Sequence, residues 1–67
     1  MSQELNDFYA FLIGKKFIYA KSMVFALQLR AIIKDNQPIP VDNTYKENRL
    51  NVELDGENTI INILSVG

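Results

Sequence analysis

The feature that most constrains this chain is the segment KDNQPIPVDNTYKEN at residues 34–48, which favours neither a helix nor a central strand. Its two prolines lack the backbone N–H that both structures use, and its Asn and Asp residues favour turns. A connection of this length without secondary structure is usually either functional or disordered. We therefore expect an exposed loop at residues 35–48. A connection that binds nothing is the simpler alternative.

Apolar periodicity on both sides of this segment predicts one helix and three strands. Before it, apolar residues recur at spacings of three and four, which predicts a helix over residues 16–30 with a core face of Phe17, Ala20, Val24 and Leu27. A short branched run then predicts a buried strand at residues 31–34.

The last third of the chain predicts a β-hairpin. RLNVELD alternates polar and apolar residues, so Leu50, Val52 and Leu54 are expected to face the core of a strand at residues 49–55. Asp55-Gly56 begins a turn, and TIINILSV predicts a second strand at residues 59–66. The expected fold is α+β, a single small domain spanning residues 1–67, with one helix packed on a small mixed sheet.

Composition excludes several classes of function. The 67 residues include no cysteine and no histidine, so we expect no disulfides, no metal site and no catalysis that relies on imidazole or thiol. We therefore expect neither an enzyme nor a cofactor. Seven basic and eight acidic residues give a net charge of −1 without a basic run, which argues against nucleic-acid binding.

The hydropathy of the chain argues against a membrane protein. Its most apolar stretch, residues 17–29, is too short to span a bilayer of roughly 30 Å and contains Lys21. The first residues, MSQELND, carry acidic side chains where a secretion signal has basic ones. We expect a cytoplasmic protein or a trimmed, mature secreted form.

Arg49 stands directly after the predicted loop, on the strand face opposite the core side chains. From there its guanidinium can reach beneath the loop, where Asp42 is an available carboxylate. The two prolines also reduce the freedom that the loop loses when a partner holds it extended. The alternative is a solvated surface arginine whose ion pair is worth about 0–1 kcal/mol.

A family resemblance extends this interpretation. LIGK at residues 12–15, a predicted helix, PVDNTYKENRLNVELD at residues 40–55 and a glycine at Gly67 follow one another in order. Together they resemble the potato type I family of serine protease inhibitors, whose members include eglin-like proteins. TYKENRLNVELDGENTI is more similar still to the related bacterial and fungal elastase inhibitors.

The resemblance implies a reversible, substrate-like inhibitor of subtilisin- or elastase-like serine proteases. It places the scissile bond between Asn43 and Thr44, within a protease-binding loop that consists of Val41, Asp42, Asn43, Thr44, Tyr45 and Lys46. It also implies that three residues brace the loop from below, namely Arg49, Asn51 and the carboxyl group of Gly67.

Several residues depart from the family pattern. Family members commonly place Thr before an apolar scissile residue and an acidic or polar residue after it, whereas this chain has Asp42, Asn43 and Thr44. Plant members place a second arginine where this chain has Asn51, a loss that a pair between Asp42 and Arg49 could partly offset. A polar Asn43 makes chymotrypsin a doubtful target, since desolvating an unpaired amide costs about 1–3 kcal/mol.

These departures leave two alternative functions open. One is an interaction or structural module that keeps the fold without inhibition. The other, suggested by Asn43, is an inhibitor of an asparagine-specific cysteine protease. A separate question concerns Ile18, Tyr19, Phe25 and Leu29, which add apolar surface outside the expected core face of the helix. Either Tyr19 and Phe25 fold over the sheet edges, or the four residues form an exposed patch that drives self-association. We expect the first, and hence a monomer.

Overall fold

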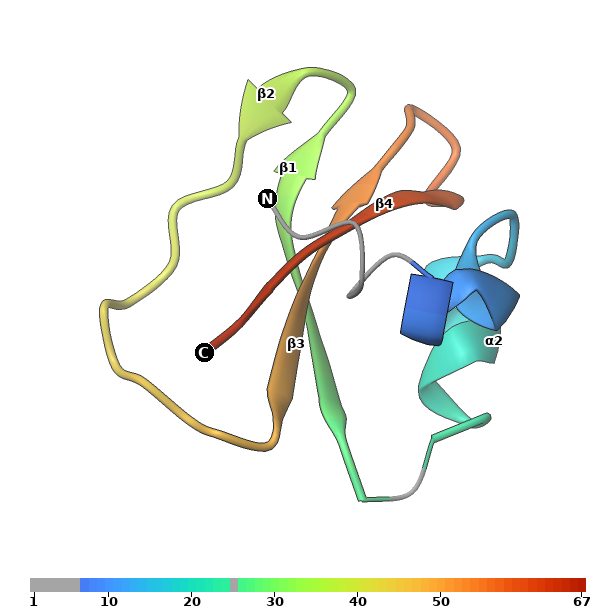
Figure 1. The fold of residues 1–67 in the computed structure, drawn as a ribbon. Helices are drawn as coiled ribbons and strands as arrows, with labels where there is room; N and C mark the ends of the chain where they lie inside the picture. Colours follow the sequence, from blue (N-terminus) through green and yellow to red (C-terminus); the bar gives the residue numbers. More distant parts are fainter. Residues whose placement is uncertain (1–6, 25) are drawn as a thin grey trace.

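The computed structural model describes residues 7–24 and 26–67, which fold around a four-stranded mixed sheet with a short helix on one face (Figure 1). The strand order is β2-β1-β3-β4, with β1 parallel to β3 and the other pairs antiparallel. The elements are η1 (Ala10–Leu12), α2 (Phe17–Lys21), β1 (Gln28–Lys34), β2 (Gln37–Pro38), β3 (Arg49–Leu54) and β4 (Ile60–Val66). The expected α+β class is confirmed. Residues 1–6 of the MSQELND segment, and Phe25, lie outside the described residues.

The core lies between α2 and the helix-facing side of the sheet. Leu50, Val52 and Leu54 are buried as their alternation predicts. The complete set of buried apolar residues among those described is Leu12, Ala20, Leu50, Val52, Leu54, Ile60 and Ile63. Phe17 and Val24 pack against this cluster from its edge. Of the four side chains expected on the core face, Phe17, Ala20, Val24 and Leu27, only Ala20 is fully buried in the core.

The LIGK segment at residues 12–15 leads from η1 toward α2 and forms hydrogen bonds with the start of β4. Gly14 has a φ of +90°, a conformation that a residue with a Cβ rarely adopts. Its N–H donates to the Ile60 carbonyl at 2.8 Å, and the Ile60 N–H donates to the Lys15 carbonyl at 2.9 Å. The glycine therefore lets the chain turn and pair with β4 at once.

The predicted helix is wrong over most of its length. α2 ends at Lys21, and residues 28–30, for which the periodicity predicts a helix, form the first part of β1. The sequence LQLRA also alternates with a period of two, and strand pairing with β3 gives its backbone hydrogen-bond partners in that conformation. Tertiary pairing therefore decided between two competing periodicities. β1 is also half-buried along most of its length instead of fully buried.

The predicted loop is shorter than expected at its beginning. Asp35 and Asn36 have φ values of 53° and 63°, and they connect β1 to β2 in a two-residue hairpin in which Lys34 pairs with Gln37. Positive φ at both central residues gives the twist that favours such a tight hairpin. β2 contains Pro38 and lies at the edge of the sheet, where a missing N–H is tolerated. The irregular segment is therefore residues 39–48.

The C-terminal hairpin agrees with the sequence to within a residue at each end. The Asp55 carboxylate closes its turn by accepting the N–H groups of Glu57 and Thr59 at 2.8 and 3.0 Å. These hydrogen bonds, and the positive charge of Lys16, lower the pKa of Asp55 from its ordinary 3.8. Asn58, with a φ of 66°, completes the turn.

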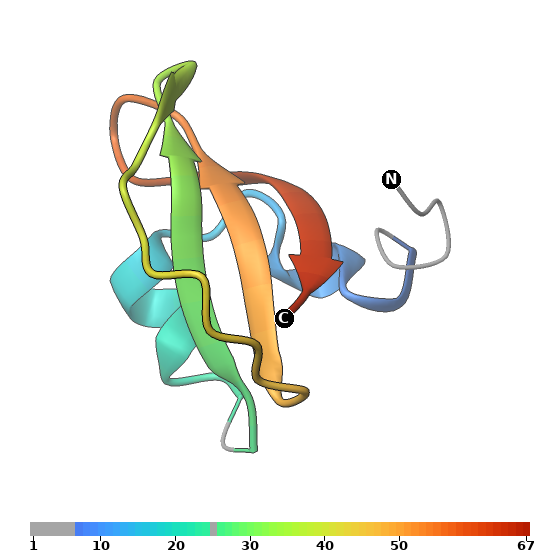
Figure 2. The same ribbon diagram turned by 90° about the vertical axis from the view of Figure 1, so that its left-hand side faces the viewer.

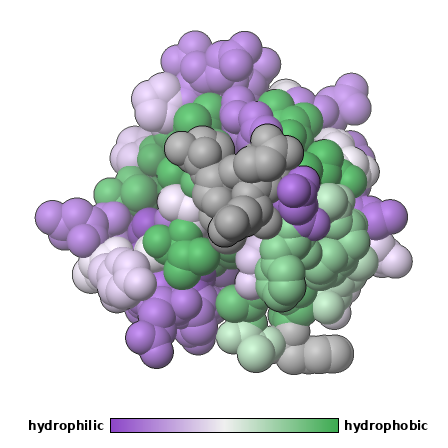
Figure 3. All heavy atoms as spheres, in the orientation of Figure 1, coloured by the Kyte–Doolittle hydropathy of each residue, from purple (hydrophilic) through white to green (hydrophobic). Residues whose placement is uncertain are grey.

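The two faces of the sheet carry different segments. The irregular segment crosses one face of β1 and β3, and α2 packs on the other (Figures 1 and 2). Apolar side chains also gather over the helical region at the lower right of Figure 3. Ile18 is 81% exposed and Tyr19 is largely exposed, whereas Leu29, expected beside them, belongs to β1 and packs against the core. The alternative of a four-residue patch is therefore excluded by Leu29. The expected packing of Tyr19 over a sheet edge is also wrong, because Tyr19 is 59% exposed and does not pack against the core cluster.

Candidate functional site

The candidate site is the exposed irregular segment that leaves β2 and returns to β3 (Figure 2). Its residues 40–48 are all exposed. The sequence-predicted binding residues Val41, Asp42, Asn43, Thr44, Tyr45 and Lys46 lie along it. Ile39 anchors the beginning through its N–H, which donates to the Ile32 carbonyl at 2.9 Å. The Arg49 N–H donates to the Lys46 carbonyl at 3.1 Å and anchors the end.

Arg49 lies beneath this segment and is 7% exposed. Its Nη2 donates to the Thr44 carbonyl at 2.6 Å, and its Nε donates to the main-chain oxygen of Gly67 at 2.9 Å. The Gly67 N–H in turn donates to the Arg49 carbonyl at 2.8 Å. The alternative of a solvated arginine is therefore wrong. One guanidinium connects the exposed loop, β3 and the residue after β4 with charge-assisted hydrogen bonds.

Asp42 and Thr44 bond to each other across Asn43. The Asp42 carboxylate accepts the Thr44 hydroxyl at 2.7 Å and the Thr44 N–H at 3.3 Å. These hydrogen bonds from Thr44 lower the pKa of Asp42 from its ordinary 3.8, with smaller contributions from the charges of Arg49 and Arg30. A carboxylate before Asn43 and a hydroxyl after it thus span the Asn43–Thr44 peptide bond.

Arg30 is the residue of this site that sequence reasoning missed. Its Nη1 lies 3.4 Å from both the carbonyl and a carboxylate oxygen of Asp42, so the ion pair expected between Asp42 and Arg49 forms with Arg30 instead. The predicted helix includes Arg30 and so places it far from the loop. The usable signal was the alternation of LQLRA, which puts Gln28 and Arg30 on one side of a strand.

Asn51 is 5% exposed and lies between polar side chains of the two neighbouring strands. Its Oδ1 accepts the Arg30 Nε–H at 2.9 Å, and its Nδ2 donates to the Ser65 hydroxyl at 3.1 Å. No buried side-chain nitrogen or oxygen lacks a hydrogen-bond partner in the part of the chain that the structure describes. The polar side of β3 is thus fully satisfied despite its burial.

Gly67 packs closely under Tyr45. A Cβ placed on Gly67 would lie 3.1 Å from Cδ1 of the Tyr45 ring, and the φ of Gly67 is +146°. Both facts disfavour a larger residue at this position. Tyr45 is itself largely exposed, so its ring covers Gly67 on one side and faces solvent on the other.

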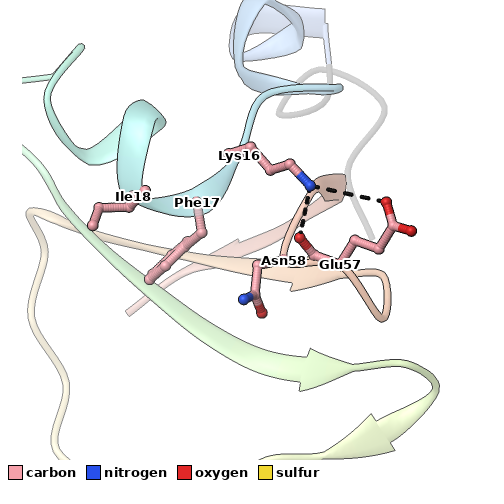
Figure 4. A pocket seen from close by; sticks show the side chains of 5 residues that line it. All are labelled: Lys16, Phe17, Ile18, Glu57 and Asn58. Atoms are coloured by element: carbon pink, nitrogen blue, oxygen red, sulfur yellow. Dashed lines mark hydrogen bonds and ion pairs between the residues drawn. The ribbon is translucent and has the colours of Figure 1, made fainter.

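A separate pocket lies beside α2, on the other face of the sheet (Figure 4). Its lining consists of Lys16, Phe17, Ile18, Glu57 and Asn58. Lys16 Nζ donates to the Glu57 carbonyl at 2.9 Å and lies 3.9 Å from the Glu57 carboxylate, and both side chains are mainly exposed. An exposed pair of this kind is screened by solvent and contributes little. We therefore place the candidate site at the loop.

The remaining features of the described chain add no other chemistry. Residues 7–24 and 26–67 contain no cluster of acidic side chains suited to a metal ion. Nor do they form a helix with the length and hydropathy needed to cross a membrane. Comparison with known proteins adds no relative, because no family model matches the chain and no curated protein or solved structure matches it significantly.

Proposed function

We propose that this protein is a reversible, substrate-like inhibitor of serine endopeptidases of the subtilisin or elastase type. Residues 41–46 bind the protease, and the Asn43–Thr44 bond occupies its catalytic centre. The observation that carries the proposal is the buried Arg49 guanidinium, which donates to the Thr44 carbonyl from beneath an exposed loop at 2.6 Å. A connection that binds nothing has no need of a buried charge under its centre.

A braced loop supports tight binding for an entropic reason. Proteases hold substrates as an added extended strand, with side chains in successive pockets. A free peptide loses conformational entropy when it is held in this way, whereas a loop already fixed to a sheet loses little. The hydrogen bonds of Arg49 and the bridge between Asp42 and Thr44 supply that order before binding.

The same bracing would keep net hydrolysis of the Asn43–Thr44 bond slow. The protease serine attacks the Asn43 carbonyl carbon, which forms an acyl-enzyme, and the Thr44 nitrogen leaves as an amine that takes the serine's proton. Hydrolysis is complete only when water then attacks the acyl-enzyme and releases the serine. If both new ends stay in place, the Thr44 amine can attack the acyl-enzyme at Asn43 and re-form the bond, releasing the protease serine. Arg49 retains the Thr44 side through its carbonyl. The protein then behaves as a substrate that is rarely released as product.

The side chain of Asn43 points the proposal toward proteases with broad specificity. Asn43 is exposed, and no hydrogen bond of its side chain is found in the described chain. Enzymes that bind mainly the extended backbone should accept it, whereas an enzyme with a deep apolar pocket gains less from a polar amide. Subtilisin and elastase are therefore preferred over chymotrypsin.

Titration against several proteases tests this proposal. Subtilisin, an elastase, chymotrypsin and an asparaginyl endopeptidase are each mixed with the protein, and mass spectrometry locates any cleavage. We expect inhibition of the first two, with slow cleavage between Asn43 and Thr44. Inhibition of the asparaginyl enzyme alone would move the target to cysteine proteases. Absence of inhibition throughout would leave an interaction module that lacks this activity.

A further inference from the structure

We propose that Arg30 is a second loop-positioning residue, which holds the chain before the Asn43–Thr44 bond while Arg49 holds the chain after it. The inference starts from a row of polar side chains across the sheet. Arg30 on β1 is in register with Asn51 on β3, and Asn51 is in register with Ser65 on β4. Residues in register on neighbouring strands point to the same face, so all three lie on the loop side.

Hydrogen bonds along this row fix the direction of the Arg30 guanidinium. Ser65 accepts from Asn51 Nδ2 at 3.1 Å, and Asn51 Oδ1 accepts from Arg30 Nε at 2.9 Å. Asn51 is buried and has both its amide oxygen and its amide nitrogen engaged, so it presents one oxygen to Arg30 in a defined place. With Nε held there, the planar guanidinium directs Nη1 toward Asp42 in the loop and Nη2 toward Gly67.

Nη1 reaches the part of the loop that precedes Asn43, and Nη2 reaches Gly67. Nη1 lies 3.4 Å from the Asp42 carbonyl and 3.4 Å from its carboxylate, and Nη2 lies 3.5 Å from the Gly67 oxygen. These contacts are long, so electrostatic attraction contributes more than hydrogen-bond geometry. The Arg30 side chain is 21% exposed, which reduces screening on its side of the pair.

Arg49 contacts the other side of the same bond. Its side chain bonds to Thr44 and Gly67, whereas that of Arg30 bonds to Asp42, Asn51 and Gly67. Both arginines contact Gly67. Arg30 also contacts the loop before the Asn43–Thr44 bond, and Arg49 contacts it after that bond. The side-chain hydrogen bonds of Asn51 go to Arg30 and Ser65 and not to the loop, so its contribution is to orient Arg30. The assignment of the two sides to a reactive bond rests on the proposed function, whereas the positioning of Asp42 by Arg30 does not.

Backbone order in the free protein tests the positioning directly. Arg30→Gln removes the cation but keeps a polar side chain, and Lys34→Gln on the same strand is the matched control. We expect ¹⁵N order parameters to fall at residues 41–43 in Arg30→Gln more than at Thr44 and Tyr45, and to stay unchanged in Lys34→Gln. Arg49→Ala should give the opposite gradient. Arg30→Lys should restore part of the order, because lysine supplies the charge but not the planar guanidinium that contacts Asn51 and Asp42 together.

A protease assay tests the link to the reactive bond. With subtilisin, we expect Arg30→Gln to be cleaved about two- to fivefold faster than the parent, the effect of an exposed ion pair, and Lys34→Gln at the parent rate. Ser65→Ala should accelerate cleavage less than Arg30→Gln does. Unchanged order at residues 41–43 in Arg30→Gln, or equal loss there and in β3, overturns the positioning of the loop by Arg30.

The two proposals can fail separately. If the parent inhibits but Arg30→Gln is cleaved no faster than Lys34→Gln, the link between Arg30 and the bond is wrong and the inhibitor proposal stands. If the parent neither inhibits nor is cleaved in the loop, the inhibitor proposal fails, and the order parameters still decide whether Arg30 holds Asp42.

Discussion

The two faces of β3 are both buried, and they are buried by different chemistry. Toward α2 the strand presents Leu50, Val52 and Leu54, which pack in the apolar core. Toward the loop it presents Arg49 and Asn51, which are 7% and 5% exposed and engaged in hydrogen bonds. Apolar burial contributes roughly 25 cal/mol per Å² without regard to direction, whereas a hydrogen bond requires its partner in one place.

The two faces of β3 therefore have different roles: the apolar face stabilises the fold, and the polar face positions the loop. The helix-facing side contributes most of the free energy of folding, because the transfer of apolar surface out of water is the main driving force of folding. The loop-facing side contributes less net energy, since its polar groups exchange water for protein partners. Its directional bonds nevertheless fix where Asp42 and Thr44 lie. Substitutions on the two faces should therefore have different consequences.

The largest expected effect is on stability, from the helix-facing side. Leu50→Ala should lower the free energy of unfolding by about 2–5 kcal/mol, because it removes buried methyl groups and leaves a cavity. Chemical denaturation measures the loss. Ile61→Ala on β4, where the side chain is partly exposed, is the control and should cost far less. Equal losses from the two variants would contradict the assignment of the core to this face.

The second effect is on the loop, from the polar face of the same strand. Arg49→Ala should cost about 1–3 kcal/mol of stability, because it removes the hydrogen bonds that the buried guanidinium donates to Thr44 and Gly67. It should also turn a slow substrate of subtilisin into one that is cleaved to completion between Asn43 and Thr44. Mass spectrometry over time gives the rate, with Arg49→Lys as the control that retains charge but loses the forked geometry. Equal rates in parent and Arg49→Ala would show that this side does not position the loop.

A change within the exposed loop should alter specificity without altering stability. Asn43→Leu should improve chymotrypsin inhibition by about 1–3 kcal/mol, the usual gain from filling an apolar pocket. The denaturation midpoint should stay within error of the parent, since Asn43 is exposed. If neither parent nor variant inhibits any of the tested proteases at micromolar concentration, the inhibitor proposal is wrong.

Acid should loosen the loop through Asp42. Because hydrogen bonds with Thr44 lower the Asp42 pKa below 3.8, the order that they supply is complete above that pH and is lost as the pH falls through the lowered pKa. NMR order parameters at residues 41–44 between pH 6 and pH 2 measure this loss. Asp42→Asn should remove the pH dependence at the loop. The same acid response in that variant would assign it to another group, such as Asp55 in the distant turn.

The smallest expected effect concerns the exposed apolar side chains over α2. Ile18 and Tyr19 are largely exposed, but they form no continuous surface with Leu29, which packs against the core. Sedimentation should show a monomer up to about millimolar concentration, where an association of about −4 kcal/mol would become visible. Dimerisation that Ile18→Ser abolishes would instead make this region an interface.

Much of the candidate site could be predicted from local sequence. Prolines and turn-forming residues predicted the exposed segment, and the alternation of residues 49–54 predicted that Arg49 would lie beneath it. The start of the segment was misplaced, because Asp35-Asn36 is a less familiar pair for a two-residue hairpin than those that contain glycine. The partner of Asp42 was also misplaced, since no local pattern reports which of two arginines is nearer in space.

By itself the sequence determined the elements whose signals do not compete. RLNVELD has a single periodicity, and Asp55 closes its turn with hydrogen bonds to residues a few positions away. Only tertiary structure decided the secondary structure of residues 28–30. Helical and strand periodicities overlap there, and pairing with β3 favours the strand. That decision moved Arg30 onto the loop side of the sheet, beside Asn51 and Asp42. The physical reason is that strand pairing joins residues distant in sequence, so the neighbours of a side chain depend on which strands meet.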